Sequence, residues 1–371
     1  MRGQAVQPIV IAAGGTGGHF FPAEALAAEL LTRGHRIALM TDARSGGGES
    51  PVFAGRDAFV LNGAGIAGRG VRRAAGAAFA LAAGTAQARA ILARLDASAI
   101  VGFGGYPSVP PVLAARLLRR RPRVILHEQN AVLGRANRML ARFADQLALG
   151  MAGTTRLPRG KPGIVTGNPV RPAIAALAAQ PYQPPLPDGP LELLVIGGSQ
   201  GARVFSDALP AAIALLPAPL RARLRITQQC RPEDLARTRA AYAVLGVGAE
   251  LSAFFPDMAE RLARAHFVVA RAGASTVAEL AAAGRPALLV PLPHAIDAHQ
   301  LYNAMAVDAG LLEQAEFERS PLALAEALVQ RIACPDMLAV QAHAMAAHGT
   351  PDAARRLADL VEQTATQGIR A

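Results

Sequence analysis

Short apolar runs alternate with amphipathic stretches along the first half of the chain. Residues 8–13 form a β-branched run that ends at glycines, and residues 36–41 form the next apolar run. Between them, residues 22–31 have helical spacing, with a proline in the first turn and Gly34 after the end. The pattern continues with strands predicted at 99–103, 124–127 and 146–149, and helices at 109–118 and 135–143. Such alternation predicts a parallel sheet with helices on both faces.

A proline-rich segment then divides the chain. Residues 171–190 end in a cluster of prolines, which is the composition of a linker. A second alternating series follows, with strands predicted at 191–196, 224–227, 267–270 and 287–290, and helices at 202–216 and 276–283. The last periodic stretch, 352–364, predicts an amphipathic helix that packs back on either domain. We therefore expect an α/β protein with Rossmann-like domains at 1–170 and 171–349, the first joined by a helix within 350–371.

Composition excludes several classes of protein. The chain has 371 residues, of which 52% are hydrophobic, and this is too apolar for a disordered protein. The two cysteines, Cys230 and Cys334, have no His or Cys neighbours at metal-ligand spacing and cannot form a disulfide framework, which fits a reducing cytoplasm. Residues 1–15 lack a cleavage site, and the uncharged run 74–88, mostly alanine and glycine, is too short to span a bilayer. We expect no targeting or membrane-spanning segment.

Positive charge is concentrated in the first domain. Residues 1–170 contain 21 Lys and Arg against 8 Asp and Glu, whereas the remainder contains 17 against 19. A basic half beside a nearly neutral half favours contact of the first domain with an anionic membrane or another polyanion. The alternative is an arginine-biased composition without a partner. A nucleic acid is not expected, because aromatic residues are only 4%, tryptophan is absent and no motif that reads DNA or RNA is present.

Both domains open with a strand, a glycine-rich turn and a helix. The turns are residues 14–19 and 197–201. Glycine lets the backbone approach a ligand closely, and the N–H groups at the start of a helix attract phosphate. Tight turns also use glycine for packing alone, so each loop is ambiguous by itself. Two such loops, on either side of a cleft expected between the domains, favour a pair of phosphate sites.

Two common nucleotide motifs do not fit the first loop. Asp42 ends the second strand where a ribose-binding carboxylate would lie, but the dinucleotide fingerprint places Phe20 where its third glycine belongs. The single lysine, Lys161, precedes proline, so it does not form a Walker motif. The phosphate is therefore not expected to belong to a dinucleotide or to a Walker-type nucleotide site.

Six motifs, in order and over nearly the whole chain, resemble the MurG family, the N-acetylglucosaminyltransferases of lipid II synthesis. They are 14–19, 103–108, 127–134, 167–171, 197–202 and the region 271–303. The resemblance implies a GT-B fold, in which two Rossmann-like domains with parallel sheets face a cleft. It also implies inverting transfer of N-acetylglucosamine from UDP-GlcNAc to the C4 hydroxyl of lipid I, the undecaprenyl-pyrophosphate-linked N-acetylmuramyl-pentapeptide. This peptidoglycan reaction would take place at the cytoplasmic face of the inner membrane.

The same resemblance assigns the binding residues. The second domain would hold UDP-GlcNAc, with Ser199 and Gln200 at the phosphates, the backbone of Phe255 at the uracil and Glu279 at both ribose hydroxyls. The full donor set is Thr16, Gly17, Gly18, Asn130, Arg171, Ser199, Gln200, Phe255, Ala274, Ser275, Thr276, Glu279 and Gln300. The acceptor pyrophosphate set is Gly14, Gly15, Thr16, Gly17, Gly18, His19, Gly104, Gly105 and Tyr106. The alternative function is a UDP-N-acetylglucosamine 2-epimerase, which shares the fold and the donor, or another UDP-sugar enzyme of the same fold.

Transfer requires a base for the acceptor hydroxyl. His19 is the first candidate, because an imidazole ordinarily titrates near neutrality. The alternatives for His19 are a helix cap or a ligand of the acceptor phosphate. Glu128 is the rival base, and it could equally be a structural carboxylate at the end of a buried strand. No Asp-x-Asp motif is present, so neither a catalytic metal nor another cofactor is expected.

A basic segment with apolar interruptions would bring the enzyme to its lipid-linked acceptor. Basic and apolar residues on one helix suit binding at an anionic membrane surface. The predicted membrane residues are Arg69, Val71, Arg72, Arg73, Phe79, Leu81 and Arg89. A solvated helix face is the alternative interpretation.

Overall fold

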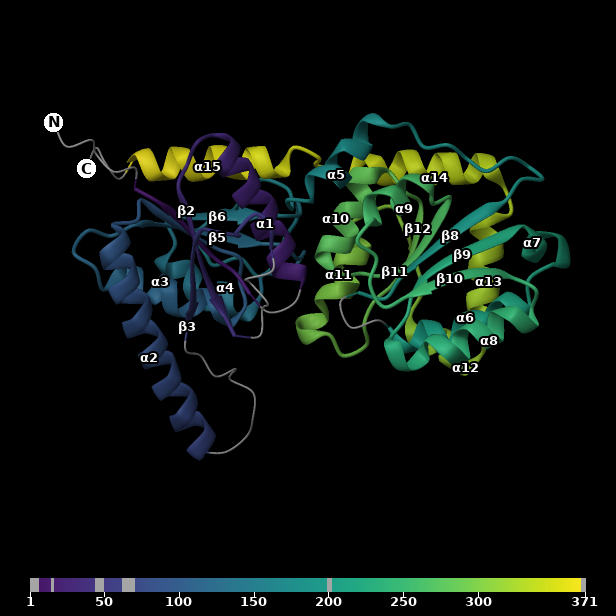
Figure 1. Ribbon diagram of the computed structural model, residues 1–371, viewed down its shortest axis with the longest axis horizontal. Coiled ribbons are helices and arrows are strands. Elements are labelled where there is room, and N and C mark those ends of the chain that lie inside the picture. The colour runs from purple at the N-terminus through teal and green to yellow at the C-terminus, as the bar shows by residue number, and fades with distance from the viewer. Residues whose placement is uncertain (1–6, 15–16, 44–49, 62–70, 199–201, 368–371) are drawn as a thin grey trace. The chain divides into compact units, whose positions relative to one another are not determined.

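The computed structural model describes residues 7–14, 17–43, 50–61, 71–198 and 202–367, without the side chains of 71–75 and 367 (Figure 1). The chain divides into two compact units, each with its own sheet. Unit 1 comprises Met1–Arg171 and Asp352–Ala371, and unit 2 comprises Pro172–Pro351.

The sheet of unit 1 has seven strands in the order β3-β2-β1-β4-β5-β6-β7, and all its strand pairs are parallel. The strands are β1 (Ile9–Ala12), β2 (Ile37–Asp42), β3 (Asp57–Leu61), β4 (Ala99–Gly102), β5 (Arg123–Glu128), β6 (Gln146–Leu149) and β7 (Ile164–Val165). The helices of this unit are α1 (Gly17–Thr32), α2 (Val71–Leu95), α3 (Val109–Arg116), α4 (Arg135–Leu140) and α15 (Ala353–Gln367). The chain moves outward from β1 in both directions, so the strand order reverses beside β1. In open α/β sheets, ligands bind at the carboxyl ends of the strands at such a switch point.

Helices cover both faces of this sheet. One apolar cluster joins the sheet to α2 and α3, and a second joins its other face to α1 and α15. Helix α15 lies against α1, β4 and β5, and its Leu357 and Val361 are fully buried. The C-terminal segment therefore completes the core of unit 1, although all of unit 2 lies between it and the rest of unit 1 in the chain.

Ion pairs also fasten α15 to α1. The Arg33 guanidinium, on the residue after α1, donates to Asp359 at 2.7 Å, to Glu362 at 2.8 Å and to Glu29 at 2.8 Å. Hydrogen bonds to these carboxylates raise the pKa of Arg33, against the opposing effect of burial. The same Glu362 carboxylate also contacts His35 at 2.6 Å.

We predict that Arg33→Ala lowers the free energy of unfolding by about 1–2 kcal/mol, because several partly buried carboxylates lose one shared cation. Arg36→Ala is the matched control, since Arg36 pairs only with Asp57 in the described structure and both side chains are at least 40% exposed. Its expected cost is about 0.5 kcal/mol or less. Chemical denaturation of the full chain measures both variants, and equal effects would contradict the fastening role of Arg33.

The sheet of unit 2 has six parallel strands in the order β10-β9-β8-β11-β12-β13 (Figure 1). These are β8 (Leu191–Ile196), β9 (Leu224–Gln229), β10 (Gly248–Ser252), β11 (Phe267–Arg271), β12 (Ala287–Val290) and β13 (Gly310–Leu311). Its helices are α5 (Pro172–Ala175), α6 (Arg203–Ala214), α7 (Ala218–Arg223), α8 (Leu235–Val244), α9 (Met258–Arg264), α10 (Ala274–Ala283), α11 (His299–Met305), α12 (Gln314–Arg319), α13 (Pro321–Ile332) and α14 (Pro335–Ala347). Strand order again reverses beside the first strand, β8, so both units repeat one plan.

Several boundaries differ from the sequence-based expectation. Helix α1 begins at Gly17 rather than at residue 22, and Pro22 lies inside it. The glycines at its start are poor helix formers, so only the folded context shows that the helix includes them. The edge strands β3 and β10 were not predicted, because a half-exposed edge strand lacks the continuous apolar run of a buried one.

One helix bears on the expectation that no segment spans a membrane. Within the described residues, the stretch Gly76–Leu95 of α2 is long enough and apolar enough to cross a membrane, with a mean hydropathy of 1.2. The uncharged run 74–88 covers only part of this stretch, because Arg89 and Arg94 interrupt its apolar residues. This finding rests on length and composition alone. Of the 18-residue window that meets the criterion, 17% is buried.

Candidate functional site

The described acceptor and catalytic residues of unit 1, together with Asn130 of the donor set, lie at the carboxyl ends of three neighbouring strands. Gly14 follows β1, and Gly17, Gly18 and His19 form the first turn of α1. The sequence Gly104, Gly105 and Tyr106 follows β4, and Glu128 and Asn130 lie at the end of β5. Because β1, β4 and β5 are adjacent, the sheet brings residues from distant parts of the sequence to one edge.

Close packing explains two of these glycines. A Cβ atom at Gly17 would lie 2.7 Å from the Phe21 ring, so no side chain fits there without a shift of that ring. Gly105 has φ 67° and ψ 178°, a backbone conformation that is essentially restricted to glycine. A Cβ on Gly105 would also lie 3.7 Å from Nε2 of His19. The loop after β4 is therefore built so that its backbone runs beside the His19 ring.

The Tyr106 side chain points its polar end into the protein. Its hydroxyl is buried and has no hydrogen-bond partner among the described residues. Burial raises the pKa of this phenol above its ordinary value. The acceptor role of Tyr106 stays a prediction from the sequence.

Both oxygens of the Glu128 carboxylate accept hydrogen bonds. Its Oε1 accepts from the backbone and side-chain nitrogens of Asn130, at 3.0 and 2.9 Å. Its Oε2 accepts from Gly134 N at 2.8 Å and Asn137 Nδ2 at 2.9 Å. The residue is 2% exposed. These contacts favour the structural alternative for Glu128, in which it holds the loop after β5 and fixes Asn130.

His19 has a different environment. It is half-buried, and its Nδ1 contacts Gln129 Oε1 at 2.9 Å. Gln129 in turn contacts His127, which is fully buried, and burial lowers the pKa of His127 to about 4. Neither Gln129 nor His127 was among the site residues predicted from the sequence. The only sequence feature that pointed to these two residues was their position beside Glu128 and Asn130 in one motif.

In unit 2, the predicted donor residues lie at the carboxyl ends of β8 and β11. Gly197 and Gly198 follow β8, and Gly198 has φ 81°. Helix α10 begins with buried Ala274 and half-buried Ser275 and Thr276. Its N-cap is Gly273, which has no side chain to satisfy the first N–H groups of the helix.

Glu279 and Gln300 lie on the two helices that follow. Glu279 is half-buried on α10, and the Gln300 Oε1, on α11, accepts from Leu292 N at 2.9 Å. The loop before α11 is strained, because His294, Asp297 and Ala298 have φ between 53° and 60°. Strained backbone of this kind concentrates at ligand sites, and sequence analysis gave no indication of it.

The Phe255 ring packs against an arginine side chain. It is 3% exposed, and the Arg261 guanidinium lies 4.0 Å from its ring centroid. Arg261 also pairs with Glu250 and Asp257, and these hydrogen bonds lower the pKa of both carboxyl groups. The Phe255 side chain is thus part of the core of unit 2, so only its backbone is predicted to contact a ligand.

Arg171, a predicted donor residue, belongs to unit 1. Its guanidinium packs over the Phe21 ring, 5.1 Å from the ring centroid.

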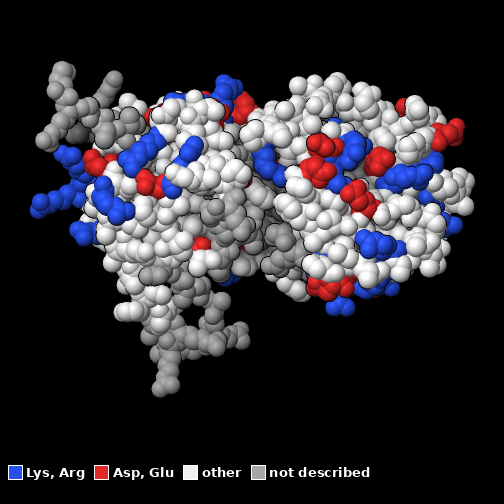
Figure 2. All heavy atoms as spheres, viewed as in Figure 1, with Lys and Arg blue, Asp and Glu red and all other residues white. Residues whose placement is uncertain are grey.

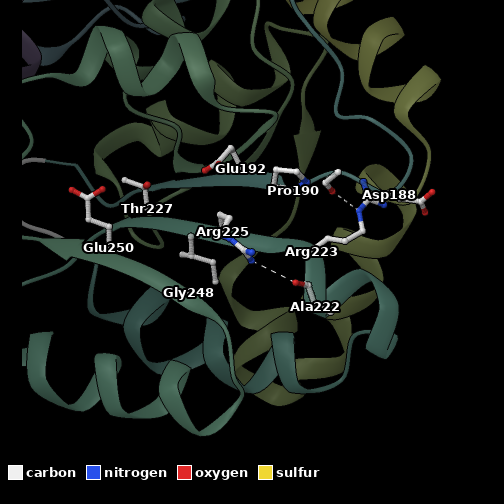
Figure 3. Close-up of a pocket in the computed structure, with 11 residues that line it drawn as sticks. Asp188, Pro190, Glu192, Ala222, Arg223, Arg225, Thr227, Gly248 and Glu250 are labelled. Atoms are coloured by element: carbon white, nitrogen blue, oxygen red, sulfur yellow. Dashed lines mark hydrogen bonds between the residues drawn. The ribbon is translucent and has the colours of Figure 1, made fainter.

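A hollow of about 570 Å³ lies elsewhere in unit 2 (Figure 3). Glu192, Arg225 and Gly248 line it, and each lies at the amino end of its strand. The glycines and α10 lie at the opposite ends of the same parallel sheet. This hollow is therefore separate from the predicted donor site.

Several predicted residues cannot be placed. Gly15, Thr16, Ser199, Gln200 and Arg69 lie outside the described residues. Val71, Arg72 and Arg73 belong to α2, but their side chains are outside the description. Within the described part of the chain, no group of three or more His, Cys, Asp or Glu side chains could hold a metal ion.

Comparisons with known proteins agree over the whole chain. Residues 9–149 match the glycosyltransferase family 28 N-terminal domain, and residues 192–357 match the C-terminal domain of that family. A "UDP-N-acetylglucosamine--N-acetylmuramyl-(pentapeptide) pyrophosphoryl-undecaprenol N-acetylglucosamine transferase" from Granulibacter bethesdensis is 60% identical over 98% of this chain and 95% of its own length. The enzyme of the same name from Acidiphilium cryptum is 53% identical, with complete coverage of both chains.

Solved structures agree as well. MurG of Acinetobacter baumannii is 30% identical, with a TM-score of 0.76 over 96% of this chain and 99% of that chain. This confirms the predicted GT-B type of fold. A UDP-GlcNAc 2-epimerase from Neisseria meningitidis has a TM-score of 0.64 over 96% of this chain and 100% of that chain, but at 12% identity it is similar in fold alone.

Proposed function

The chain belongs to glycosyltransferase family 28, and we propose that it transfers N-acetylglucosamine from UDP-GlcNAc to lipid I with His19 as the base. The reaction is the one that its full-length relatives are named for. The observation that carries the assignment is their 60% and 53% identity over essentially the whole chain. His19 supports it in the structure, because it lies on the first turn of α1, half-buried beside Gly105.

The chemistry is a single displacement. The acceptor C4 hydroxyl gives its proton to Nε2 of His19 while its oxygen attacks the anomeric carbon of the donor. The bond between that carbon and the UDP oxygen breaks, and its electron pair leaves with the diphosphate. Attack opposite the leaving group converts an α-linked donor into a β-linked product.

The donor site supplies the charge stabilisation. A departing diphosphate gains negative charge, and the N–H groups at the start of a helix stabilise such charge. Helix α10 begins at glycine-capped Ala274, and the turn after β8 contains Gly197 and Gly198. Together with Arg171, and with Ser199 and Gln200 as predicted from the sequence, these groups are proposed to bind the UDP phosphates.

We predict that Glu279→Gln raises the Kd for UDP-GlcNAc by about 100-fold. A carboxylate accepts strongly from two ribose hydroxyls, and a charge-assisted hydrogen bond contributes about 1.5–3 kcal/mol. Isothermal titration with UDP-GlcNAc measures the change. Glu326→Gln, on exposed α13 surface of the same unit, is the control. Equal affinity of Glu279→Gln and wild type would contradict the ribose contact.

Labelled UDP-GlcNAc, with and without a lipid I analogue, tests the function as a whole. Transfer predicts that donor is consumed only when the acceptor is present, with one labelled lipid formed for each UDP released. An epimerase would convert or hydrolyse the donor without the acceptor. That outcome would overturn the proposed function.

A basic and apolar surface of unit 1 is proposed to bind the inner membrane from the cytoplasmic side. Phe79 on α2 is 77% exposed and Leu117 at the end of α3 is 59% exposed. The two helices pack together, and Arg89 Nε donates to Leu117 O at 3.3 Å. Arg119, Arg120 and Arg121 follow and are exposed, and Figure 2 shows how arginines gather on this unit. Leu81 is half-buried against the core, and Arg69, Val71, Arg72 and Arg73 remain sequence-based predictions.

We predict that changing Arg119, Arg120 and Arg121 to Glu weakens binding to anionic vesicles by about 100-fold or more, since each basic residue near such a surface contributes about 1 kcal/mol. Vesicle co-sedimentation measures it. The control changes three exposed arginines of unit 2, Arg225, Arg239 and Arg319, to Glu. The control has the same net charge, so equal loss in both variants would show that total charge, and not this surface, determines binding. Turnover of a soluble acceptor should be unchanged.

A further inference from the structure

The orientation of the Gln129 side-chain amide is determined by two carbonyl groups. Gln129 is 1% exposed, and its Nε2 lies 3.0 Å from Phe103 O and 3.2 Å from His127 O. Backbone carbonyls only accept hydrogen bonds, so the nitrogen of the amide must face them. The amide oxygen, Oε1, therefore faces the other way, toward His19.

This orientation determines the position of the proton on His19. Gln129 Oε1 can only accept, and it lies 2.9 Å from Nδ1 of His19. Nδ1 must therefore carry the hydrogen, and in the neutral ring Nε2 then carries the lone pair. Nε2 is the nitrogen beside Gly105, in the loop after β4. The other tautomer would place two acceptors against each other at Gln129, and a flip of the ring would replace the Nδ1–H donor there with a C–H group.

His127 supports the same arrangement from inside the protein. Its Nε2 lies 3.1 Å from Gly167 O, which makes Nε2 a donor, so Nδ1 accepts from Gln129 Nε2 at 3.0 Å. Burial lowers the pKa of His127 to about 4, and the nearby His19 acts in the same direction. His127 is therefore neutral near pH 7, and its Nδ1 lone pair accepts the hydrogen bond from Gln129. Protonation would put a second N–H against the amide N–H.

We propose that Gln129 is a positioning residue that holds His19 in the Nδ1–H tautomer, with the lone pair of Nε2 ready to take the proton of the acceptor hydroxyl. The catalytic part of this inference rests on the proposed function. Orientation of a base through its second nitrogen is a general device, and a wrong tautomer abolishes most of the activity of such a base. An amide is neutral, so it directs the ring without adding a charge beside it.

Nitrogen NMR of the full-length protein, labelled at histidine, tests the tautomer without reference to transfer. At alkaline pH the two ring nitrogens of a neutral imidazole differ in chemical shift according to which one bears hydrogen. The His19 signals are assigned by their loss in His19→Ala. We expect the Nδ1–H pattern in the wild-type protein, and a shift toward the Nε2–H pattern of free imidazole in Gln129→Met. The Nε2–H pattern in the wild type would overturn the proposal.

Kinetics test the consequence for catalysis. Gln129→Met has similar length and no hydrogen-bonding groups, and we expect its kcat to fall by about 10- to 100-fold with an unchanged KM for UDP-GlcNAc. The control is Gln228→Met, because Gln228 is a fully buried glutamine of unit 2 that also hydrogen-bonds through its amide. Equal kcat for the two variants would overturn the positioning role. Full activity of His19→Ala would instead refute His19 as the base, while the NMR result would still decide the tautomer.

Discussion

Replacing His19 with alanine should reduce kcat by about 10²- to 10⁴-fold, the range that a positioned general base contributes. The loss follows from the geometry at the end of β1, where the ring is half-buried and Nε2 lies beside Gly105. The KM for UDP-GlcNAc should change little, because His19 is assigned to the acceptor and is not among the residues predicted to bind the donor. Initial rates with a lipid I analogue, at saturating concentrations of both substrates, measure the effect.

The control for this experiment is His343→Ala, since His343 is exposed on α14 of unit 2. Its kcat should match the wild type. A His19→Ala variant that keeps kcat but raises the KM for the acceptor would contradict the role of base. That result would instead support the alternative that His19 binds acceptor phosphate.

Replacing Glu128 with alanine should mainly destabilise unit 1. The change leaves the nitrogens of Asn130, Gly134 and Asn137 without the carboxylate that accepts from them. Each buried donor without an acceptor costs about 1–3 kcal/mol, so we expect the free energy of unfolding to fall by about 3–5 kcal/mol. Denaturant titration of the full chain measures it. Glu128→Gln should recover little of this lost stability, because the NH₂ group of the glutamine would face N–H donors that now bind a carboxylate oxygen.

Glu326→Ala serves as the stability control, because Glu326 is exposed on α13. Its effect on unfolding should be within about 0.5 kcal/mol. A Glu128→Ala protein that is as stable as the wild type, but has lost turnover, would make Glu128 the base. The combination of the His19 and Glu128 experiments thus separates the two candidates that the sequence left open.

Much of the fold is determined by local sequence patterns. The strands β6, β8 and β12 begin and end where the apolar runs predict, because buried parallel strands require continuous apolar residues. The glycine turns after β1 and β8 were predictable for a similar reason, since their residue type is set by backbone geometry. The concentration of arginine in residues 1–170 is likewise a property of composition alone.

What the sequence did not decide is which side chains meet. His19 and Gln129 are separated by 110 positions, and the strand order that makes β1, β4 and β5 neighbours brings them within hydrogen-bond distance. Sequence motifs nominated His19 as the first candidate for the base and Glu128 as its rival. Only the folded protein distinguishes them, because the Glu128 carboxylate accepts four hydrogen bonds whereas the His19 imidazole is half-buried. Hydrogen-bond satisfaction is a property of the tertiary arrangement, because its partners come from separate elements, and so it leaves no periodic trace in the chain.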